Sequence, residues 1–527
     1  MKYILVACFF ALCLSCTQNS NHVEDAQLGD LDHQFPVSEA ARPSFEKGLL
    51  LLHSFEYDDA REAFEKAREA DPNEVMVYWG LAMTHYKALW GLQDVDAGRE
   101  VIQQLGKDRE DRLSKAENEL ERDFWLGIEI LYGEGELLER NQKYVDHMAQ
   151  VYEDHPDNLE VAAFYSLGLM WADYDNQEYL DKSSDIAAGI IEENPTHPGA
   201  LHYMIHANDN PKFAKVAIHA ADQYAKVAPD ATHALHMPSH IYVALGMWNE
   251  VVSSNEASYQ ASLNRVERKN LDGTERGYHS MAWLHYGYLQ QGRYDKAAEL
   301  LEEMIEYHKD STASISYLIN MQNQQRVEAG YWPDHLEMQD IDVTGYQLGL
   351  ESKSQMHFLR SLLAYDEKNV NKIEKEIKSL TDILESAKLL VTNDGIALCS
   401  AGPTRYAPHK QSIAKTKVVI HQMNALAAML KEDKSEVETH FKQAIALEQE
   451  AGYDPGPPFI AYPSFEQYGD WLLIQNRHEE ALEQFNLSLK SREKRTKALK
   501  GKMAALKALN REEEAKEVAE ILAQHFR

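Results

Sequence analysis

Cysteine is almost absent from the body of this 527-residue chain. Three of the four cysteines, Cys8, Cys13 and Cys16, lie within the first sixteen residues, which leaves Cys399 alone in the remainder. A single cysteine cannot form an intramolecular disulfide, so packing must stabilise the fold. Because the neighbours of Cys399 are apolar, we interpret it as a small buried hydrophobe and not as a catalytic thiol.

Basic residues are also scarce, since 53 lysines and arginines face 85 acidic residues and give a net charge of −32. Such a surface repels phosphate backbones, and we therefore predict no nucleic-acid binding. After residue 14 no apolar run approaches the length that a membrane-spanning helix requires. We interpret the acidity as a solvated surface.

The motifs of several well-known enzyme classes are missing. The sequence has no His-Glu-x-x-His run, no pair of Cys-x-x-Cys clusters, no phosphate-binding loop and no nucleophile elbow. The sequence therefore leaves open whether the protein is an enzyme.

The first residues have the pattern of a secretory signal. Lys2 precedes an apolar run over residues 3–14, and Ser15 and Cys16 follow it. The segment resembles a bacterial lipoprotein signal, which implies cleavage after residue 15, a lipid on Cys16 and residence in the bacterial cell envelope. An ordinary secretory signal is the alternative. Residues 16–42 are polar and aperiodic, which is typical of a tether. The lipid on Cys16 is the only membrane attachment that we expect.

Helical periodicity fills nearly everything after residue 42. Between residues 44 and 72, Gly48, Ala60, Phe64 and Pro72 fit the 34-residue tetratricopeptide pattern of two antiparallel helices. Gly48 and Ala60 permit close helix approach, Phe64 fills the groove, and Pro72 stops the second helix. This segment predicts one helical hairpin.

The 34-residue spacing recurs along the chain. It separates Ala481 from Ala515 and Ala217 from Val251. We therefore predict an all-α, tetratricopeptide-type helical-repeat solenoid with degenerate repeats. Residues 43–350 are expected to form its N-terminal repeats with a histidine-rich centre, and residues 351–527 its C-terminal repeats.

Two stretches rich in glycine and proline, 401–408 and 452–458, interrupt the helical pattern. The second either crosses the concave face of the solenoid or links two repeats, and we favour a linker.

Histidine is concentrated in the centre, where seven of the 23 histidines lie between residues 197 and 240. Pro198 at a first helical position predicts His197 as the helix cap. His202 and His206 are then four residues apart on one helical face, the spacing with which paired histidines bind a transition metal.

The second pair, His236 and His240, has the same spacing but a different backbone. Pro238 predicts a helix start, with His240 in the first turn and His236 just ahead of it. We expect both pairs to converge on the inner face of the solenoid and to form one polar pocket, with His233 and His279 as additional candidates. Structural bracing, in which each imidazole binds a backbone carbonyl, is the alternative.

The two histidine segments, 197–206 and 232–242, resemble a family of bacterial tetratricopeptide proteins. The family's hallmarks are a His-Pro-Gly-Ala-x-His-Tyr-x-Ile-His stretch and a downstream His-Met-Pro-Ser-His-Ile segment, and both are present here. The resemblance extends over most of the mature chain. It implies the fold and the location of a site, and no activity.

Two functions are consistent with these observations. The first is a binding or scaffold protein of the cell envelope whose concave face holds a peptide or protein partner. The alternative is a metal-dependent enzyme or metal-binding protein that uses the central histidines. Imidazole ligands suit zinc, copper, iron or nickel, and the sequence does not choose between these metals.

Overall fold

A computed structural model describes residues 26–31, 35, 37–90, 92–336, 341, 348–389, 408 and 410–526. Helices dominate these residues, and the two-residue strands β1 (Tyr86–Lys87) and β2 (Leu92–Gln93), paired antiparallel, are the only strands within the described ranges. The predicted all-α class is confirmed. Cys16 and Cys399 lie outside the described residues.

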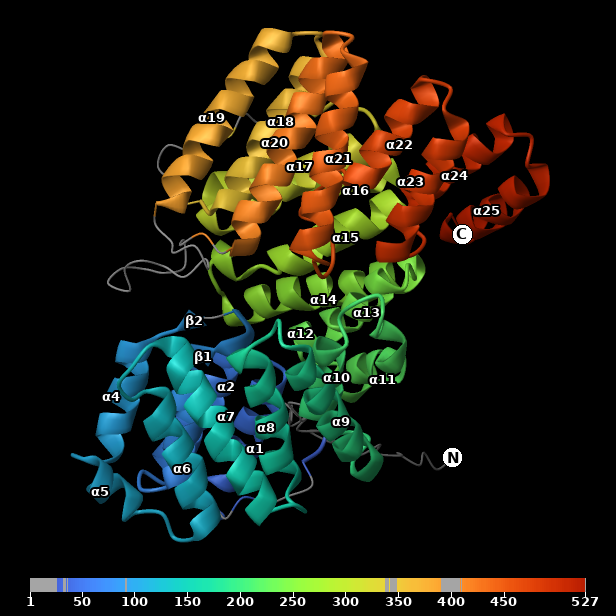
Figure 1. Ribbon diagram of the computed structural model, residues 1–527. Coiled ribbons are helices and arrows are strands. Elements are labelled where there is room, and N and C mark those ends of the chain that lie inside the picture. The colour runs from blue at the N-terminus through green and yellow to red at the C-terminus, as the bar shows by residue number, and fades with distance from the viewer. Residues whose placement is uncertain are drawn as a thin grey trace, which may run out of the picture.

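The N-terminal helices form the lower body in Figure 1. Consecutive helices pack against one another as antiparallel pairs. The helices of this body are α1 (Arg42–His53), α2 (Tyr57–Ala70), α3 (Val75–Met83), α4 (Val95–Leu105), α5 (Arg109–Leu113), α6 (Glu119–Leu131), α7 (Leu137–Asp154), α8 (Leu159–Ala172), α9 (Gln177–Glu193), α10 (Pro198–Ala207) and α11 (Ile218–Val227), with a 3-10 turn each at Ala88–Trp90 and Ala214–Val216.

Two short helices, α12 (Thr232–His236) and α13 (Pro238–Ala244), lie where the lower body meets the upper one (Figure 1). The upper body contains the remaining helices. They are α14 (Trp248–Lys269), α15 (Tyr278–Gln290), α16 (Tyr294–Asp310), α17 (Ile315–Ala329), α18 (Leu350–Asp366), α19 (Val370–Lys388), α20 (Lys410–Leu430), α21 (Lys434–Ala451), α22 (Ser464–Ile474), α23 (His478–Ser491), α24 (Thr496–Ala508) and α25 (Glu512–His525), with 3-10 turns at Gly273–Glu275 and Thr312–Ser314. In the residues that the structure describes, no helix has the length and apolarity needed to cross a membrane.

Glycine and phenylalanine together set the spacing of the first repeats. The ring of Phe64 is fully buried between Gly48 and Gly80, where an added Cβ would lie 2.7 and 2.5 Å from it. The ring therefore occupies the space that a side chain on α1 or α3 would need. Helix α2 ends at Ala70, two residues before Pro72, as predicted.

The C-terminal repeats show the same packing of a phenylalanine ring between two glycines. Phe485 of α23 lies against Gly469 of α22 and Gly501 of α24. Ala481 and Ala515, 34 residues apart, are both buried, one in each second helix of the two hairpins. The tetratricopeptide geometry therefore occurs at both ends of the array.

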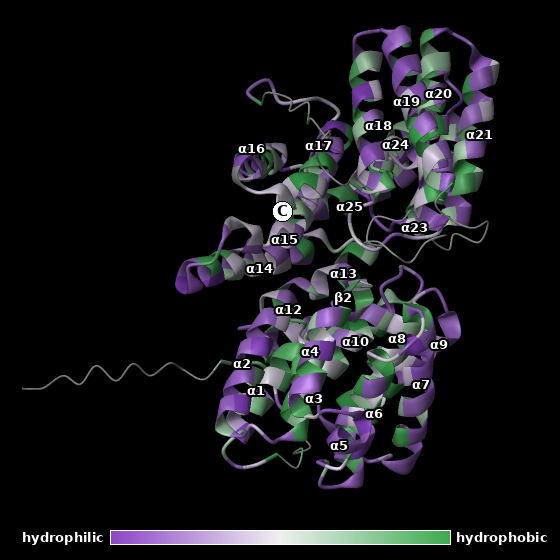
Figure 2. Cartoon of the chain, turned by 90° about the vertical axis from the view of Figure 1, so that its left-hand side faces the viewer, coloured by the Kyte–Doolittle hydropathy of each residue, from purple (hydrophilic) through white to green (hydrophobic). Residues whose placement is uncertain are grey.

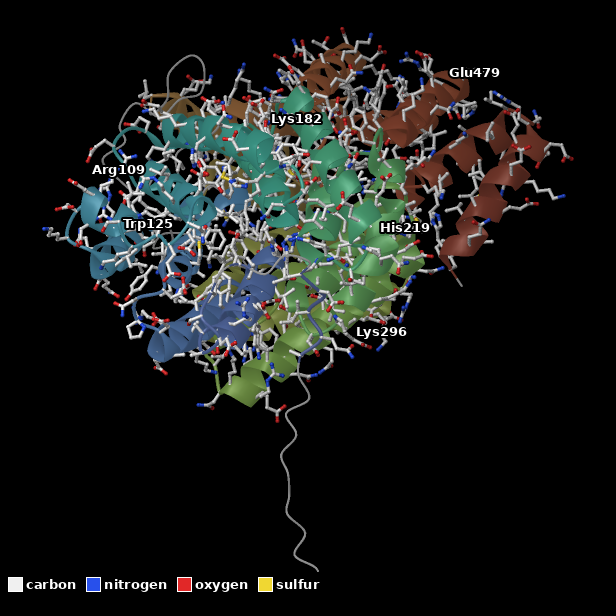
Figure 3. All side chains as sticks on the ribbon, turned by 90° about the horizontal axis from the view of Figure 1, so that it is seen from below. Arg109, Trp125, Lys182, His219, Lys296 and Glu479 are labelled. Atoms are coloured by element: carbon white, nitrogen blue, oxygen red, sulfur yellow. The ribbon has the colours of Figure 1, made fainter. Side chains whose placement is uncertain are left out.

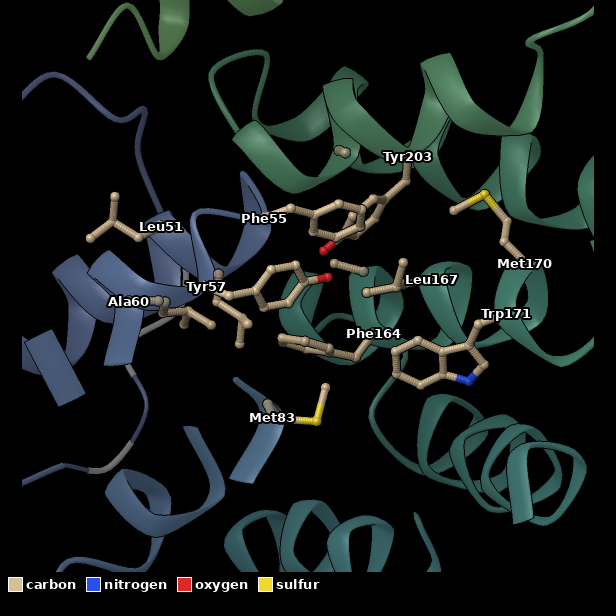
Figure 4. Close-up of a cluster of buried hydrophobic side chains, with 14 of the residues drawn as sticks. Leu51, Phe55, Tyr57, Ala60, Met83, Phe164, Leu167, Met170, Trp171 and Tyr203 are labelled. Carbon is tan, nitrogen blue, oxygen red and sulfur yellow. The ribbon is translucent and has the colours of Figure 1, made fainter. Parts of the chain in front are cut away.

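Hydrophobic and hydrophilic residues alternate along most helices, as the hydropathy colouring in Figure 2 shows, and buried apolar side chains form the core between the helices. Figure 4 shows part of the core of the lower body, where Phe55, Tyr203 and Phe164 lie among aliphatic side chains. The outer surface carries the charge, with exposed side chains such as Arg109, Lys182 and Glu479 (Figure 3).

A buried arginine ties the end of the chain to its middle. Arg495 is fully buried, and its guanidinium donates to Glu466 at 2.7 Å, to the Tyr286 hydroxyl at 2.6 Å and to the Ala461 carbonyl at 3.2 Å, and it forms an ion pair with Glu328.

The next residue, Thr496, extends this tie to α15. Its backbone N–H donates to the Gln290 side chain at 2.8 Å and its hydroxyl to the Gln290 carbonyl at 2.6 Å. The array therefore closes back on α15 across 206 residues of sequence.

Candidate metal centre

The six histidines that the sequence singles out come together at the junction of the two bodies. They form two sets, within each of which one nitrogen per ring lies within 4.8 Å of the others. Set one, on α10 and α12, is His202, His206 and His233, and set two, on α12, α13 and α15, is His236, His240 and His279. The central block holds two more histidines: His197 caps α10, and His219 is exposed on α11 (Figure 3).

Helix α10 begins as predicted. The Nδ1 atom of His197 accepts the Ala200 backbone N–H at 3.1 Å, and Pro198 occupies the first turn. With the helix fixed there, His202 and His206 stack on one face with ring centroids 4.8 Å apart. After α10 the chain passes through a turn at Pro211, and α11 begins at Ile218.

The break at Pro238 positions set two. Helix α12 ends at His236 and α13 begins at Pro238, so His240 lies in the first turn of α13, as predicted. The Nε2 atoms of His236 and His240 are 3.1 Å apart. Nitrogens that bind one zinc-like ion at about 2.0–2.1 Å lie roughly 3–4 Å from each other. This pair therefore has the spacing of two ligands of a single ion.

Hydrogen bonds fix which nitrogen of each ring in this pair carries the proton. The Nδ1 of His240 lies 2.5 Å from Asp209 Oδ2, and the Nδ1 of His236 lies 2.7 Å from Asn255 Oδ1, whose amide group donates to the Val251 carbonyl. Both Nδ1 atoms are therefore N–H donors. In the neutral form of both rings the two Nε2 lone pairs then face each other, an arrangement that a shared cation would stabilise.

Set one is arranged similarly. His202 donates its Nδ1–H to the His53 carbonyl at 2.7 Å. Among the described residues, the buried Nε2 atoms of His202, His206 and His233 have no hydrogen-bond partner. Buried polar atoms are normally satisfied, so three such atoms within reach of one another indicate a missing shared ligand.

Burial lowers the pKa of His202, His206, His233 and His236 well below its ordinary value, and repulsion between neighbouring imidazoles lowers it further. The four rings are therefore neutral near pH 7. A neutral imidazole is the form that binds a metal.

His53, Glu160 and His197 form a third cluster. In this cluster the Nε2 atom of each ring, and not the Nδ1 atom, faces the acceptor. His53 accepts from the Tyr203 hydroxyl at Nδ1 (2.8 Å) and faces Glu160 with Nε2 (2.8 Å). His197 accepts from a backbone N–H at Nδ1 and faces Glu160 at 3.2 Å. The Nε2 atom of His53 therefore donates to the carboxylate, the Nε2 atom of His197 forms an ion-pair contact with it, and the two imidazoles hold the pKa of Glu160 below its ordinary value.

This third cluster, in which two imidazoles face one buried carboxylate, is a structural brace. It supports set one directly, because the His53 carbonyl holds the ring of His202. Although His53 and His197 lie on different helices far apart in sequence, their ring centroids are 5.0 Å apart.

Aromatic side chains lie against both sets. Phe55 lies 4.3 Å from the ring of His202, measured between centroids, and Trp283 lies 4.8 and 4.4 Å from His236 and His240. Gly456, at the centre of the glycine- and proline-rich stretch, packs on the ring of Trp283. That stretch therefore contacts the wall of set two and also links α21 to α22.

The partners of the histidines were only partly foreseeable. Three aspartates lie within the histidine-rich segment, and only Asp209 binds one of its histidines. Asp222 accepts from the Tyr242 hydroxyl, and Asp230 accepts from the Gln27 backbone N–H. Asn255 and Glu160 carried no local signal, because their histidine partners lie 19 and 107 residues away.

No protein-family model and no curated protein matches this chain. Similar solved structures include a human IFIT1 dimer with m7Gppp-AAAA (12% identity, 90% of this chain and 94% of that chain covered, TM-score 0.35) and yeast Tom70 (11%, 90% and 90%, 0.30). The P58(IPK) TPR domain is a third (12%, 90% and 99%, 0.21). At these scores, the fold assignment depends on the helices of this chain itself.

Proposed function

We propose that this protein binds transition-metal ions at set one and set two. The observation that carries the proposal is the pair of Nε2 lone pairs of His236 and His240, 3.1 Å apart, with both Nδ1 atoms engaged as donors. Ligand histidines in metal sites are held in this way, with the second ring nitrogen donating to a carboxylate, an amide or a carbonyl.

The types of ligand atom narrow the choice of metal ion. Six imidazoles suit zinc, copper, iron or nickel, whereas calcium, magnesium and manganese prefer oxygen ligands. Set two has its carboxylate, Asp209, behind the ring of His240 and not among the ligands.

The test is the metal content of the full chain after chelation and reloading with each of the four metals. We expect two ions per chain, and one ion in either His206→Ala or His240→Ala, because each variant removes a ligand from one set only. His219→Ala, whose ring is exposed on α11, is the matched control and should keep two ions. A wild-type chain that retains less than half an ion of every metal would refute the proposal.

Binding of a peptide or protein is the second candidate function. The array of antiparallel helix pairs favours it, since such arrays present extended surfaces to partners. The two functions can be tested separately. If a partner binds His206→Ala and His240→Ala as tightly as it binds the wild-type chain, then its binding depends on the scaffold and not on the metals.

We also propose that Cys16 carries a lipid that anchors the chain in a bacterial cell envelope. The apolar run over residues 3–14 followed by Ser15 and Cys16 supports this. Replacing Cys16 by serine should move the protein from the membrane fraction to the soluble fraction of its native host, as judged by immunoblotting. If the fractionation is unchanged, Cys16 is not the anchor.

A further inference from the structure

We propose that set one and set two form a single binuclear copper centre, which binds dioxygen between its two copper ions. This inference depends on the proposed metal binding and goes beyond it, because it specifies the metal, the coupling of the two sites and the class of ligand.

The first argument is the proximity of the two sets. Between the sets, ring centroids lie 5.8 Å apart for His206 and His240 and 6.1 Å apart for His233 and His236. Within the sets they lie 4.6–6.5 Å apart. Rings of different sets are thus as close as rings of one set, so two bound ions are near neighbours that can share one small ligand.

The second argument is the composition of the donor set. Neither set contains a carboxylate. Pairs of harder ions need carboxylates to balance their charge, whereas copper binds imidazole more tightly than zinc, iron or nickel does. Three neutral imidazoles per ion also leave a Cu(I) ion with an open coordination position and a low positive charge, the state that reacts with dioxygen.

The third argument is the aromatic lining of the two sets. Phe55 lies against set one, Trp90 lies 5.9 Å from His233 and Trp283 lies against His236 and His240, so aromatic carbon lines one side of both sets, whereas His279 is exposed. The aromatic side disfavours ionic ligands, which would lose their hydration there, and the exposed side gives access to a small uncharged molecule such as dioxygen.

The binding step balances without any further reactant. Each Cu(I) ion gives one electron to dioxygen, which becomes a peroxide dianion bound between two Cu(II) ions. The O–O double bond becomes a single bond, two copper–oxygen contacts form, and no proton is taken up or released.

The experiment uses the full chain loaded with Cu(I) without oxygen and then exposed to air. We expect two coppers per chain, and a Cu(I)-specific chelator should find almost no Cu(I) in the denatured product. Less than a tenth of the resulting Cu(II) should appear in electron paramagnetic resonance, because two Cu(II) spins joined by one bridging ligand cancel.

Variants supply the comparison. His206→Ala and His240→Ala should each hold one copper that, once oxidised by ferricyanide, gives a full resonance signal. His219→Ala should behave as the wild-type chain does.

The outcomes separate this inference from the proposed function. Two oxidised coppers that both give full signals would refute the coupling and leave metal binding intact. A chain that takes up zinc but no copper would refute the copper centre and also leave metal binding intact. Copper that stays Cu(I) in air would refute dioxygen binding. A chain that binds none of the metals would refute both proposals.

Discussion

Replacing Arg495 by methionine is expected to lower the free energy of unfolding of the C-terminal repeats by about 3–5 kcal/mol, the usual cost of removing one partner of a buried ion pair. The guanidinium is fully buried, and its loss would leave Glu466 and Glu328 without their countercharge in the core. Methionine is similar in length, so the lost charge and hydrogen bonds would dominate. Guanidinium denaturation followed by circular dichroism measures the change.

Arg477→Met is the matched control. Its guanidinium also faces two carboxylates, those of Glu438 and Glu480, but 31% of its side chain is exposed. Exposed ion pairs contribute at most about 1 kcal/mol, so this variant should unfold nearly as the wild-type chain does. Equal losses in the two variants would mean that the cluster around Arg495 does not hold the end of the array.

Replacing Asp209 by alanine is expected to weaken metal binding at set two about 10–100-fold, the range typical of residues that orient a ligand histidine. Asp209 Oδ2 accepts from His240 Nδ1 at 2.5 Å, and without it the ring is free to turn its Nε2 atom away from His236. Set one should keep its affinity, because its Nδ1 acceptor at His202 is a backbone carbonyl. Titration against a coloured chelator resolves the two affinities.

Asp222→Ala serves as the comparison, since this carboxylate binds the Tyr242 hydroxyl and touches neither set. It should leave both affinities unchanged. An Asp209→Ala chain with wild-type affinity at set two would show that Asp209 does not orient His240.

The fold was predictable wherever a residue acts within its own repeat. Gly48, Phe64 and Pro72 each have a local geometric role, so their spacing alone predicted the first hairpin. The 34-residue interval between Ala481 and Ala515 predicted the last two hairpins for the same reason.

The site was predictable only in part. The cap at His197, the stacked His202 and His206, and the helix start at Pro238 all follow from neighbours within four residues.

The parts that were missed depend on residues far apart in sequence. His53 meets Glu160 across 107 residues, and Gly456 reaches Trp283 across a still longer interval. No periodicity within a helix reports such contacts. The sequence therefore indicated the clustered histidines better than the groups that orient and cover them.

The tie between α15 and the end of the chain has a consequence for synthesis. Gln290 leaves the ribosome 206 residues before its partner Thr496, an interval of about 10–40 s at 5–20 residues per second. Helix α15, which carries His279, packs against α14, α16 and α17, so its position is set by neighbours that are made soon after it. A nascent chain can thus assemble both sets early, whereas the contact of Thr496 with Gln290 awaits an almost complete polypeptide.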